Sequence, residues 1–147
     1  MFVLQNSRTE RRNLWFQTNC FATGYFKRGF SLDLTHYGGR YMGNASLYGA
    51  SLHPIGDGVG LRFTKPFGVD QSIPIARGEV FQIPDRLWAW LDLIENNGHC
   101  YTRKVVTVVV HDPVEEDEGV EAWVYEHSYP GMNYATPIES GIYEKRH

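Results

Sequence analysis

Cysteine is scarce in this chain, and its two cysteines show none of the spacings that indicate a bound metal or a disulfide scaffold. Cys20 and Cys100 stand 80 residues apart, with no CxxC pair and no histidines at metal-binding intervals. A disulfide framework and a structural zinc site are therefore not indicated, and no metal is expected. A chain that depends on neither favours a reducing compartment, so we expect a cytoplasmic protein.

Long apolar runs and an excess of positive charge are also missing. The longest aliphatic run, Val105 to Val110, is interrupted by Thr107 and has the length of a strand. The amino terminus turns polar at Asn6, so it does not read as a secretory signal. The net charge is -3, and the one basic run, Arg8 to Arg12, reads as a solvated turn. We expect neither a membrane nor a nucleic acid as partner.

Apolar and aromatic residues are plentiful, at 42% and 14% of 147 residues. That length and composition predict one globular domain spanning 1–147, with an extra leader at 1–18 and an irregular tail at 128–147. We expect an α+β fold that is mainly β: a small mixed barrel with one clear helix on its flank and one short helix.

The alternation of apolar and polar residues predicts most of the barrel strands. Glycines within the pattern indicate bends, above all Gly49, and the short helix is expected to begin at Ser31 and end before Gly38. The segment 112–119 reads as an acidic surface turn, and the strand after the main helix as mostly buried. The expected strands are 14–25, 41–53 (either one strand or two broken at Gly49), 73–83, 100–111 and 120–127, and the segment 56–63 is expected to form a hairpin turn.

The main helix is predicted over 84–97, opened by Pro84 and Asp85 and closed by Asn96 to Gly98. At about 100° per residue, Glu95 falls roughly 40° from Leu91, on the apolar face. A carboxylate there loses hydration, which raises its pKa toward the range of a general acid/base at neutral pH. The alternative, which helical geometry leaves open, is a last-turn residue that reaches water or accepts backbone hydrogen bonds.

Several short motifs follow one another between Ala76 and Tyr125. They are Gly78-Glu79-Val80-Phe81, then Leu91-Asp92-Leu93-Ile94-Glu95, then Tyr101-Thr102-Arg103 with Val105 to Val110, and finally Ala122-Trp123-Val124-Tyr125. In the order and spacing of these motifs, over about fifty residues, the chain resembles the γ-glutamylcyclotransferase-like superfamily. We expect Asp92 and Arg103 to have structural roles, as an ion pair or as helix-end contacts.

The family's amino-terminal signature, Tyr-Gly-Ser/Thr-Leu followed by a basic residue and glycine, is only partly kept. Gly24 and Gly29 match, whereas Thr23 replaces the tyrosine and Tyr25 the small hydroxyl residue. The resemblance implies that loop amides at Gly24, Tyr25 and Phe26 hold a substrate carboxylate. The substitutions imply a changed shape and polarity around Thr23 and Tyr25.

The resemblance also implies a reaction: a γ-glutamyl amine, amide or peptide cyclises to 5-oxoproline and releases an amine, with no metal or organic cofactor. Glu95 would be the general acid/base, the residues Thr23 to Phe26 would bind substrate, and Tyr101 would either help there or pack at the barrel rim. Two other interpretations stay open. One is an inactive binding module for a small ligand or a protein, and the other is a subunit that serves assembly. The sequence predicts no particular oligomeric state.

Overall fold

The computed structural model describes residues 17–64, 73–95, 100–129 and 131–144. Its strands are β1 (Gln17–Ala22), β2 (Arg40–Tyr48), β3 (Ala50–Ile55), β4 (Gly58–Phe63), β5 (Ile75–Pro84), β6 (Tyr101–His111) and β7 (Glu118–His127). A 3-10 helix η1 (Leu34–Tyr37) and one α-helix α2 (Arg86–Ile94) complete the described elements.

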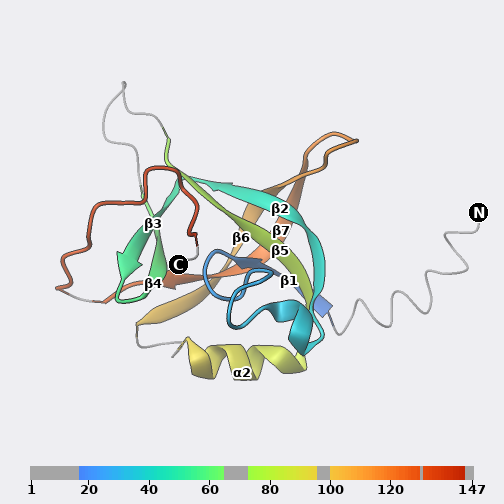
Figure 1. Cartoon of the computed structure of the whole chain (residues 1–147), viewed down its shortest axis with the longest axis horizontal. Helices are drawn as coiled ribbons and strands as arrows, with labels where there is room; N and C mark the ends of the chain where they lie inside the picture. The colour runs from blue at the N-terminus through green and yellow to red at the C-terminus, as the bar shows by residue number, and fades with distance from the viewer. Residues whose placement is uncertain (1–16, 65–72, 96–99, 130, 145–147) are drawn as a thin grey trace, which may run out of the picture.

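The strands form a closed barrel. The hydrogen-bonded order is β1-β5-β2-β6-β7-β4-β3, and an additional parallel pairing of β1 with β7 joins the ends of the first five strands in that order. The barrel is mixed because the β1–β7 pair is parallel, whereas the other four pairs are antiparallel: β1–β5, β5–β2, β2–β6 and β6–β7. The β3–β4 hairpin attaches beside it through β4 and β7 (Figure 1). The predicted α+β, mainly β barrel with one clear helix and one short helix is confirmed.

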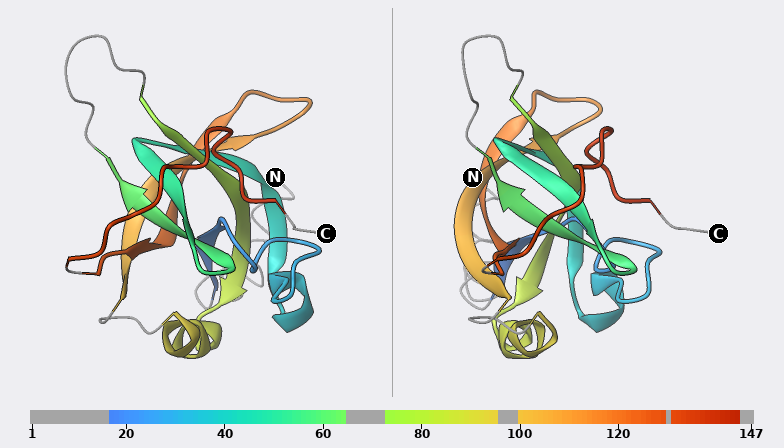
Figure 2. Two further views of the ribbon diagram at one scale, coloured as in Figure 1. Left: turned by 60° about the vertical axis from the view of Figure 1, so that its left-hand side comes forward. Right: turned by 90° about the vertical axis from the view of Figure 1, so that its left-hand side faces the viewer.

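Helix α2 lies across one end of the barrel, below the strands in Figure 1 and in both views of Figure 2. Its buried face is formed by Trp88 and Leu91, which join the core at that end with Leu34, Phe81 and Ile83. Burying aromatic and aliphatic side chains of this size contributes about 1.5–3 kcal/mol each. This packing fixes the carboxyl end of α2 against the barrel opening.

A second hydrophobic cluster fills the barrel interior, with Leu52, Leu61 and Val80 among its fully shielded residues. The tail crosses the β3–β4 hairpin, as both figures show, and is fastened by a hydrogen bond of 2.7 Å from the Ile138 N–H to the Leu52 carbonyl. The described residues of the tail form no helix or strand.

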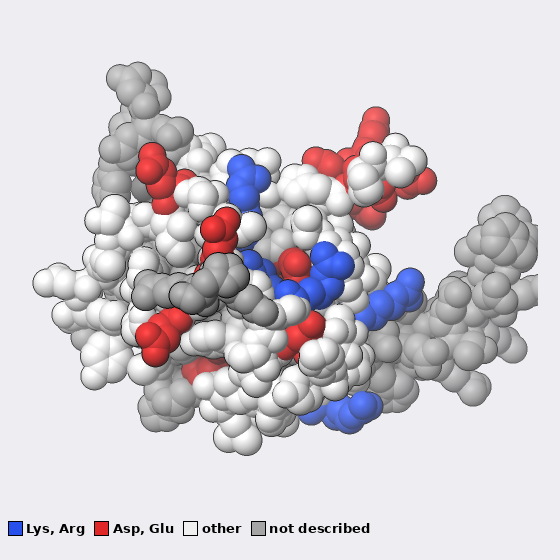
Figure 3. All heavy atoms as spheres, in the orientation of Figure 1, with Lys and Arg blue, Asp and Glu red and all other residues white. Residues whose placement is uncertain are grey.

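Several predicted features hold in detail. The strand over 41–53 is indeed broken at Gly49, whose φ of 84° lies in the left-handed region that glycine adopts easily. The segment 56–63 forms part of a hairpin, in which β3 pairs with β4. The acidic turn over 112–119 is exposed throughout, and Figure 3 shows its carboxylates gathered on the projecting loop between β6 and β7.

Other predictions are wrong in their bounds or burial. The helix runs over 86–94, shorter than 84–97, and its predicted stop at 96–98 lies outside the described residues. The short helix is capped by Asp33, not Ser31, because the Asp33 carboxylate accepts from the Thr35 N–H. The strand β6 is mostly not buried: of its residues only Val108 is, since one side of a barrel strand faces solvent.

Candidate active site

Glu95 follows the last turn of α2 and closes the helix. Its backbone N–H donates to the Leu91 carbonyl at 2.9 Å, so the side chain follows the fully buried Leu91 by one turn and points toward the barrel. Only 9% of Glu95 is exposed. Within the part of the chain that the structure describes, no hydrogen bond or ion pair reaches its carboxylate.

Burial raises the pKa of Glu95 from 4.5 to about 7. The cause is loss of hydration, which penalises the charged form. Both protonation states are therefore well populated near neutral pH, as a group that first accepts and then donates a proton requires.

The loop that follows β1 faces Glu95 across the barrel end. Hydrogen bonds hold its shape: the Lys27 N–H donates to the Gly24 carbonyl at 3.2 Å, and Leu32 and Leu34 N–H groups donate to Tyr25 and Phe26 carbonyls. Among the described residues, the N–H groups of Gly24, Tyr25 and Phe26 donate to no acceptor. Consecutive unpaired amides of this kind form a concavity that attracts anions.

All six residues nominated from the sequence line one pocket at this end of the barrel. Glu95 and Tyr101 come from α2's end and the start of β6, whereas Thr23 to Phe26 come from the loop. The remaining lining residues, which the sequence did not single out as site residues, are Cys20, Phe21, Ala22, Val59, Leu61, Val124 and Tyr125.

The Glu95 carboxylate affects the pKa of three other ionisable side chains that line the pocket. Burial, and then the nearby Glu95 carboxylate, raises the pKa of Tyr25, Tyr101 and Cys20, and for Cys20 it reaches about 12. The Cys20 thiol therefore stays protonated at neutral pH, where a thiol is a poor nucleophile. Of these two groups, Glu95 and not Cys20 has a pKa suited to proton transfer near neutral pH.

Tyr101 stands at the pocket wall with its ring against that of His127, centroid to centroid 4.6 Å. The His127 Nδ1 lies 2.8 Å from the hydroxyl of Tyr134, a residue of the tail. The His127 ring packs against Tyr101 at the start of β6, so packing alone accounts for the position of the Tyr101 ring.

A polar network fixes the end of α2 on the barrel wall. The Tyr125 hydroxyl donates to the Asp92 carboxylate, which also pairs with Arg103 at 3.3 Å. The Arg103 guanidinium lies 4.5 Å from the Trp88 ring centre and 4.9 Å from that of Trp123. The ion pair that the sequence suggested is present, and it sits one turn before Glu95.

Two further findings bear on the class of site. Within the described ranges, no group of three or more histidine, cysteine, aspartate or glutamate residues is arranged to hold a metal ion. In those same ranges no helix has the length and apolar character needed to cross a membrane.

Comparison with known proteins identifies the fold. The family model described as gamma-glutamyl cyclotransferase, AIG2-like, matches residues 20–145, which include every residue of the pocket. The chain belongs to this family. The match extends well beyond the motifs over 76–125, because it also includes the divergent loop at Thr23 to Phe26.

Solved structures agree on this fold. An AIG2-like protein from Mus musculus is 21% identical, with 88% of this chain and 97% of that chain covered and a TM-score of 0.62. A structure named gamma-glutamyl cyclotransferase is 13% identical over 84% and 72% of the two chains, with a TM-score of 0.61. An uncharacterised protein from Pyrococcus horikoshii is 16% identical over 85% and 88%, with a TM-score of 0.58. No curated protein sequence matches this chain.

Proposed function

We propose that this family member is a cyclotransferase that converts a γ-glutamyl amine, amide or peptide to 5-oxoproline and a free amine. The observation that carries the proposal is the buried Glu95 carboxylate, which has a pKa of about 7 and shares a pocket with three unpaired loop amides. The substrate is a small molecule, and the reaction uses no metal or organic cofactor.

Substrate binding in this proposal begins at the loop. The N–H groups of Gly24, Tyr25 and Phe26 hold the α-carboxylate of the glutamyl group. That anchor directs the γ-carbonyl toward Glu95, which lines the same pocket. Since the α-amine and γ-carbonyl belong to one molecule, holding the folded rotamer supplies much of the rate advantage.

The chemical step moves two protons from the α-ammonium to the leaving nitrogen. Glu95 takes the first proton, and the free amine attacks the γ-carbonyl carbon to form the ring C–N bond. Glu95 gives this proton to the leaving nitrogen as the bond between that nitrogen and the carbon breaks. The ring nitrogen then loses its second proton to Glu95, which passes it to the released amine, so the products are 5-oxoproline and an ammonium ion and the carboxylate is regenerated.

The divergent loop favours a specific alternative, a binding module that does not turn substrate over. Tyr25 lines the pocket where the family signature has a small hydroxyl residue, and it reaches the β3–β4 hairpin. It lies so close to Gly58 that an added Cβ there would stand 2.3 Å from its hydroxyl oxygen. A ring in that position narrows the space beside the loop amides.

The test is a panel of γ-glutamyl amino acids, amines and peptides incubated with the full chain and with Glu95→Gln, with 5-oxoproline measured by mass spectrometry. Glu126→Gln is a matched control, because Glu126 is a largely buried carboxylate on β7 that pairs with Lys104 away from the pocket. Product from the wild type and the control, but not from Glu95→Gln, supports the proposal. No product from folded protein, with ligand binding retained, supports the binding module.

A further inference from the structure

A second pocket lies on the outer side of the barrel and shares no residue with the Glu95 pocket. It is lined by Lys27, Asn44, Ala45, Ser46, Arg77, Gly78, Glu79, His111 and Ile142. Along β2, Ala45 and Leu47 belong to the barrel core, so Ser46 between them faces outward. The family's reaction as proposed above uses none of these side chains.

Two of these lining side chains, Ser46 and His111, form a hydrogen-bonded chain with Asp117 outside the pocket. The Ser46 Oγ lies 2.7 Å from His111 Nε2, and His111 Nδ1 lies 2.8 Å from Asp117 Oδ2. A carboxylate accepts only, so the neutral imidazole donates its Nδ1–H to Asp117 and accepts from the Ser46 hydroxyl at Nε2. An imidazole held in this tautomer is positioned as a base for a serine hydroxyl.

Strand pairing creates this arrangement. In the antiparallel register of β2 and β6, Asn44 lies opposite His111, and Ser46 is two residues farther along on the same face. Asp117 ends the loop between β6 and β7, where the chain turns back past His111. The three residues are joined only because β2 and β6 are neighbours in the barrel.

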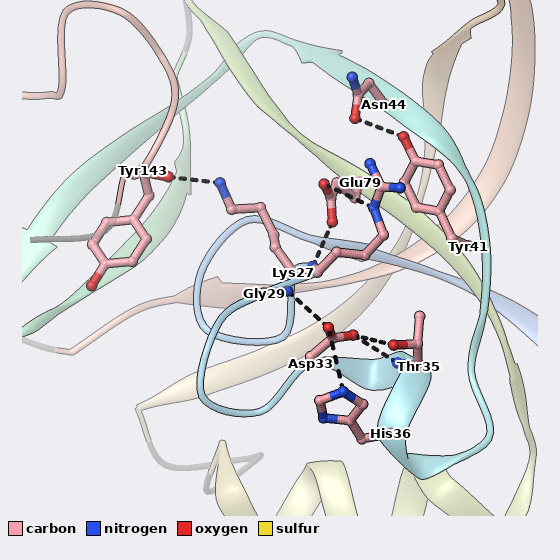
Figure 4. Close-up of polar contacts among 10 residues, drawn as sticks. Lys27, Gly29, Asp33, Thr35, His36, Tyr41, Asn44, Glu79 and Tyr143 are labelled. Atoms are coloured by element: carbon pink, nitrogen blue, oxygen red, sulfur yellow. Dashed lines mark hydrogen bonds and ion pairs between the residues drawn. The ribbon is translucent and has the colours of Figure 1, made fainter.

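Donors for a developing negative charge stand beside Ser46. The Tyr41 hydroxyl donates to Asn44 Oδ1 at 2.8 Å, as Figure 4 shows, which leaves the Asn44 NH₂ group available to donate into the pocket. Arg77 lies directly opposite Ser46 in the register of β2 with β5 and also lines the pocket. Such donors are the groups that stabilise the oxyanion in acyl transfer.

The other charges nearby are already engaged. Lys27 Nζ donates to the Tyr143 carbonyl at 2.6 Å, and the Glu79 carboxylate accepts from the Arg28 N–H at 2.7 Å (Figure 4). In the orientation of Figure 3, basic and acidic side chains gather in a hollow on this face. A neutral ester therefore suits the pocket better than a second charged group.

A purely structural interpretation explains only part of this. A buried serine needs one hydrogen-bond partner, which His111 supplies. That need does not explain why Asp117, whose side chain is 51% exposed, holds the other nitrogen of the His111 ring. It also does not explain why a pocket lies beside Ser46 and His111. Because Ser46 itself is only 1% exposed, a small, slender acyl group is the kind that reaches it.

We propose that Ser46, His111 and Asp117 form a second catalytic site, which hydrolyses small carboxylic esters independently of Glu95. The Ser46 Oγ attacks the ester carbonyl and its proton passes to His111 Nε2, while Asn44 and Arg77 stabilise the oxyanion. The bond to the leaving alcohol breaks, and His111 protonates the alcohol. Water, activated by the same imidazole, then hydrolyses acyl-Ser46 and releases the carboxylic acid.

The test uses p-nitrophenyl acetate with the full chain. The wild type is expected to release p-nitrophenol and to gain one acetyl group on the peptide that contains Ser46. Ser46→Ala removes that acetyl group and leaves only the background from surface amines. Asp117→Asn, a change on an exposed loop, slows the Ser46-dependent rate by about 100-fold or more, because the imidazole loses its orienting partner.

Two controls separate this site from its surroundings. Glu116→Gln changes the exposed neighbour of Asp117 and is expected to keep the wild-type rate. Glu95→Gln is also expected to keep it, so this proposal stands or fails apart from the proposed cyclotransferase. Equal p-nitrophenol release by folded wild type and Ser46→Ala, with no acetyl group on Ser46, overturns the second site. So does an Asp117→Asn rate equal to that of the wild type.

Discussion

The hydroxyl of Tyr125 donates a hydrogen bond to Asp92, three residues before Glu95, and thereby ties the wall of the pocket to the helix that carries its carboxylate. Asp92 holds Arg103 as well, and Arg103 lies against two tryptophan rings. The position of Glu95 therefore depends on contacts that β6 and β7 provide as well as on the packing of α2.

We expect Asp92→Ala to reduce the free energy of unfolding by about 1–3 kcal/mol, because it leaves the Tyr125 hydroxyl and Arg103 without this partner. Urea denaturation measures the change. Asp85→Ala is the matched control at the other end of α2, since Asp85 is exposed and makes no side-chain capping bond. Its effect should stay within about 0.5 kcal/mol. Equal losses of stability in the two variants would contradict a stabilising role for the Asp92 contacts with Tyr125 and Arg103.

Gly78 is predicted to tolerate no side chain. An added Cβ would lie 2.3 Å from the backbone oxygen of Ala22, where β1 and β5 approach each other. Gly78→Ala should therefore cost more than about 2 kcal/mol of stability, because backbone must move. In Gly119→Ala the nearest atom is a Thr107 methyl at an ordinary 3.5 Å, so thermal unfolding of this control should be close to that of the wild type. A wild-type melting temperature for Gly78→Ala would contradict this close approach.

The raised pKa of Glu95 predicts how stability depends on pH. The folded protein prefers the protonated form, so the stabilisation is complete below the unfolded pKa of 4.5 and is lost as pH rises to about 7. Relative to Glu95→Gln, the wild type should lose up to about 3 kcal/mol across that window. Unfolding free energies of both proteins from pH 4 to 8 measure this difference. Parallel curves would mean that Glu95 titrates normally.

Tyr101 offers a test of its hydroxyl apart from its ring. We expect Tyr101→Phe to keep the melting temperature, because the ring still packs on His127, and to lower kcat/KM by about three- to tenfold if the hydroxyl bonds substrate or Glu95. Tyr129→Phe, at an exposed tyrosine near the same end of the tail, is the control. Unchanged kinetics in Tyr101→Phe would assign the residue to packing alone.

Features that depend on local sequence could be predicted well. The inward position of Glu95 follows from its four-residue spacing after Leu91, and the break at Gly49 follows from the freedom of glycine. The loop residues Thr23 to Phe26 were found through the family resemblance and not through composition. The short-helix cap was misplaced because Ser31 and Asp33 are both good caps, and only the fold decides which side chain faces the Thr35 N–H.

Features that depend on strand pairing could not be read from one sequence. Ser46 and His111 are 65 residues apart and meet only through the β2–β6 pairing. The closure of the barrel by β1 and β7, and the entry of Tyr125 into the pocket, are long-range outcomes of the same kind. The limits of the domain, with a leader at 1–18 and a tail at 128–147, stay predictions.

The most direct test of the central claim is the pH dependence of 5-oxoproline formation, measured with the best γ-glutamyl substrate of the panel for wild type and Glu95→Gln. We expect kcat/KM of the wild type to rise with pH through an apparent pKa near 7, because the carboxylate form of Glu95 must accept the α-ammonium proton. Glu95→Gln should lose at least about 100-fold of the activity at every pH. A Glu95→Gln variant that forms 5-oxoproline at the wild-type rate would contradict the assignment of Glu95 as the acid/base.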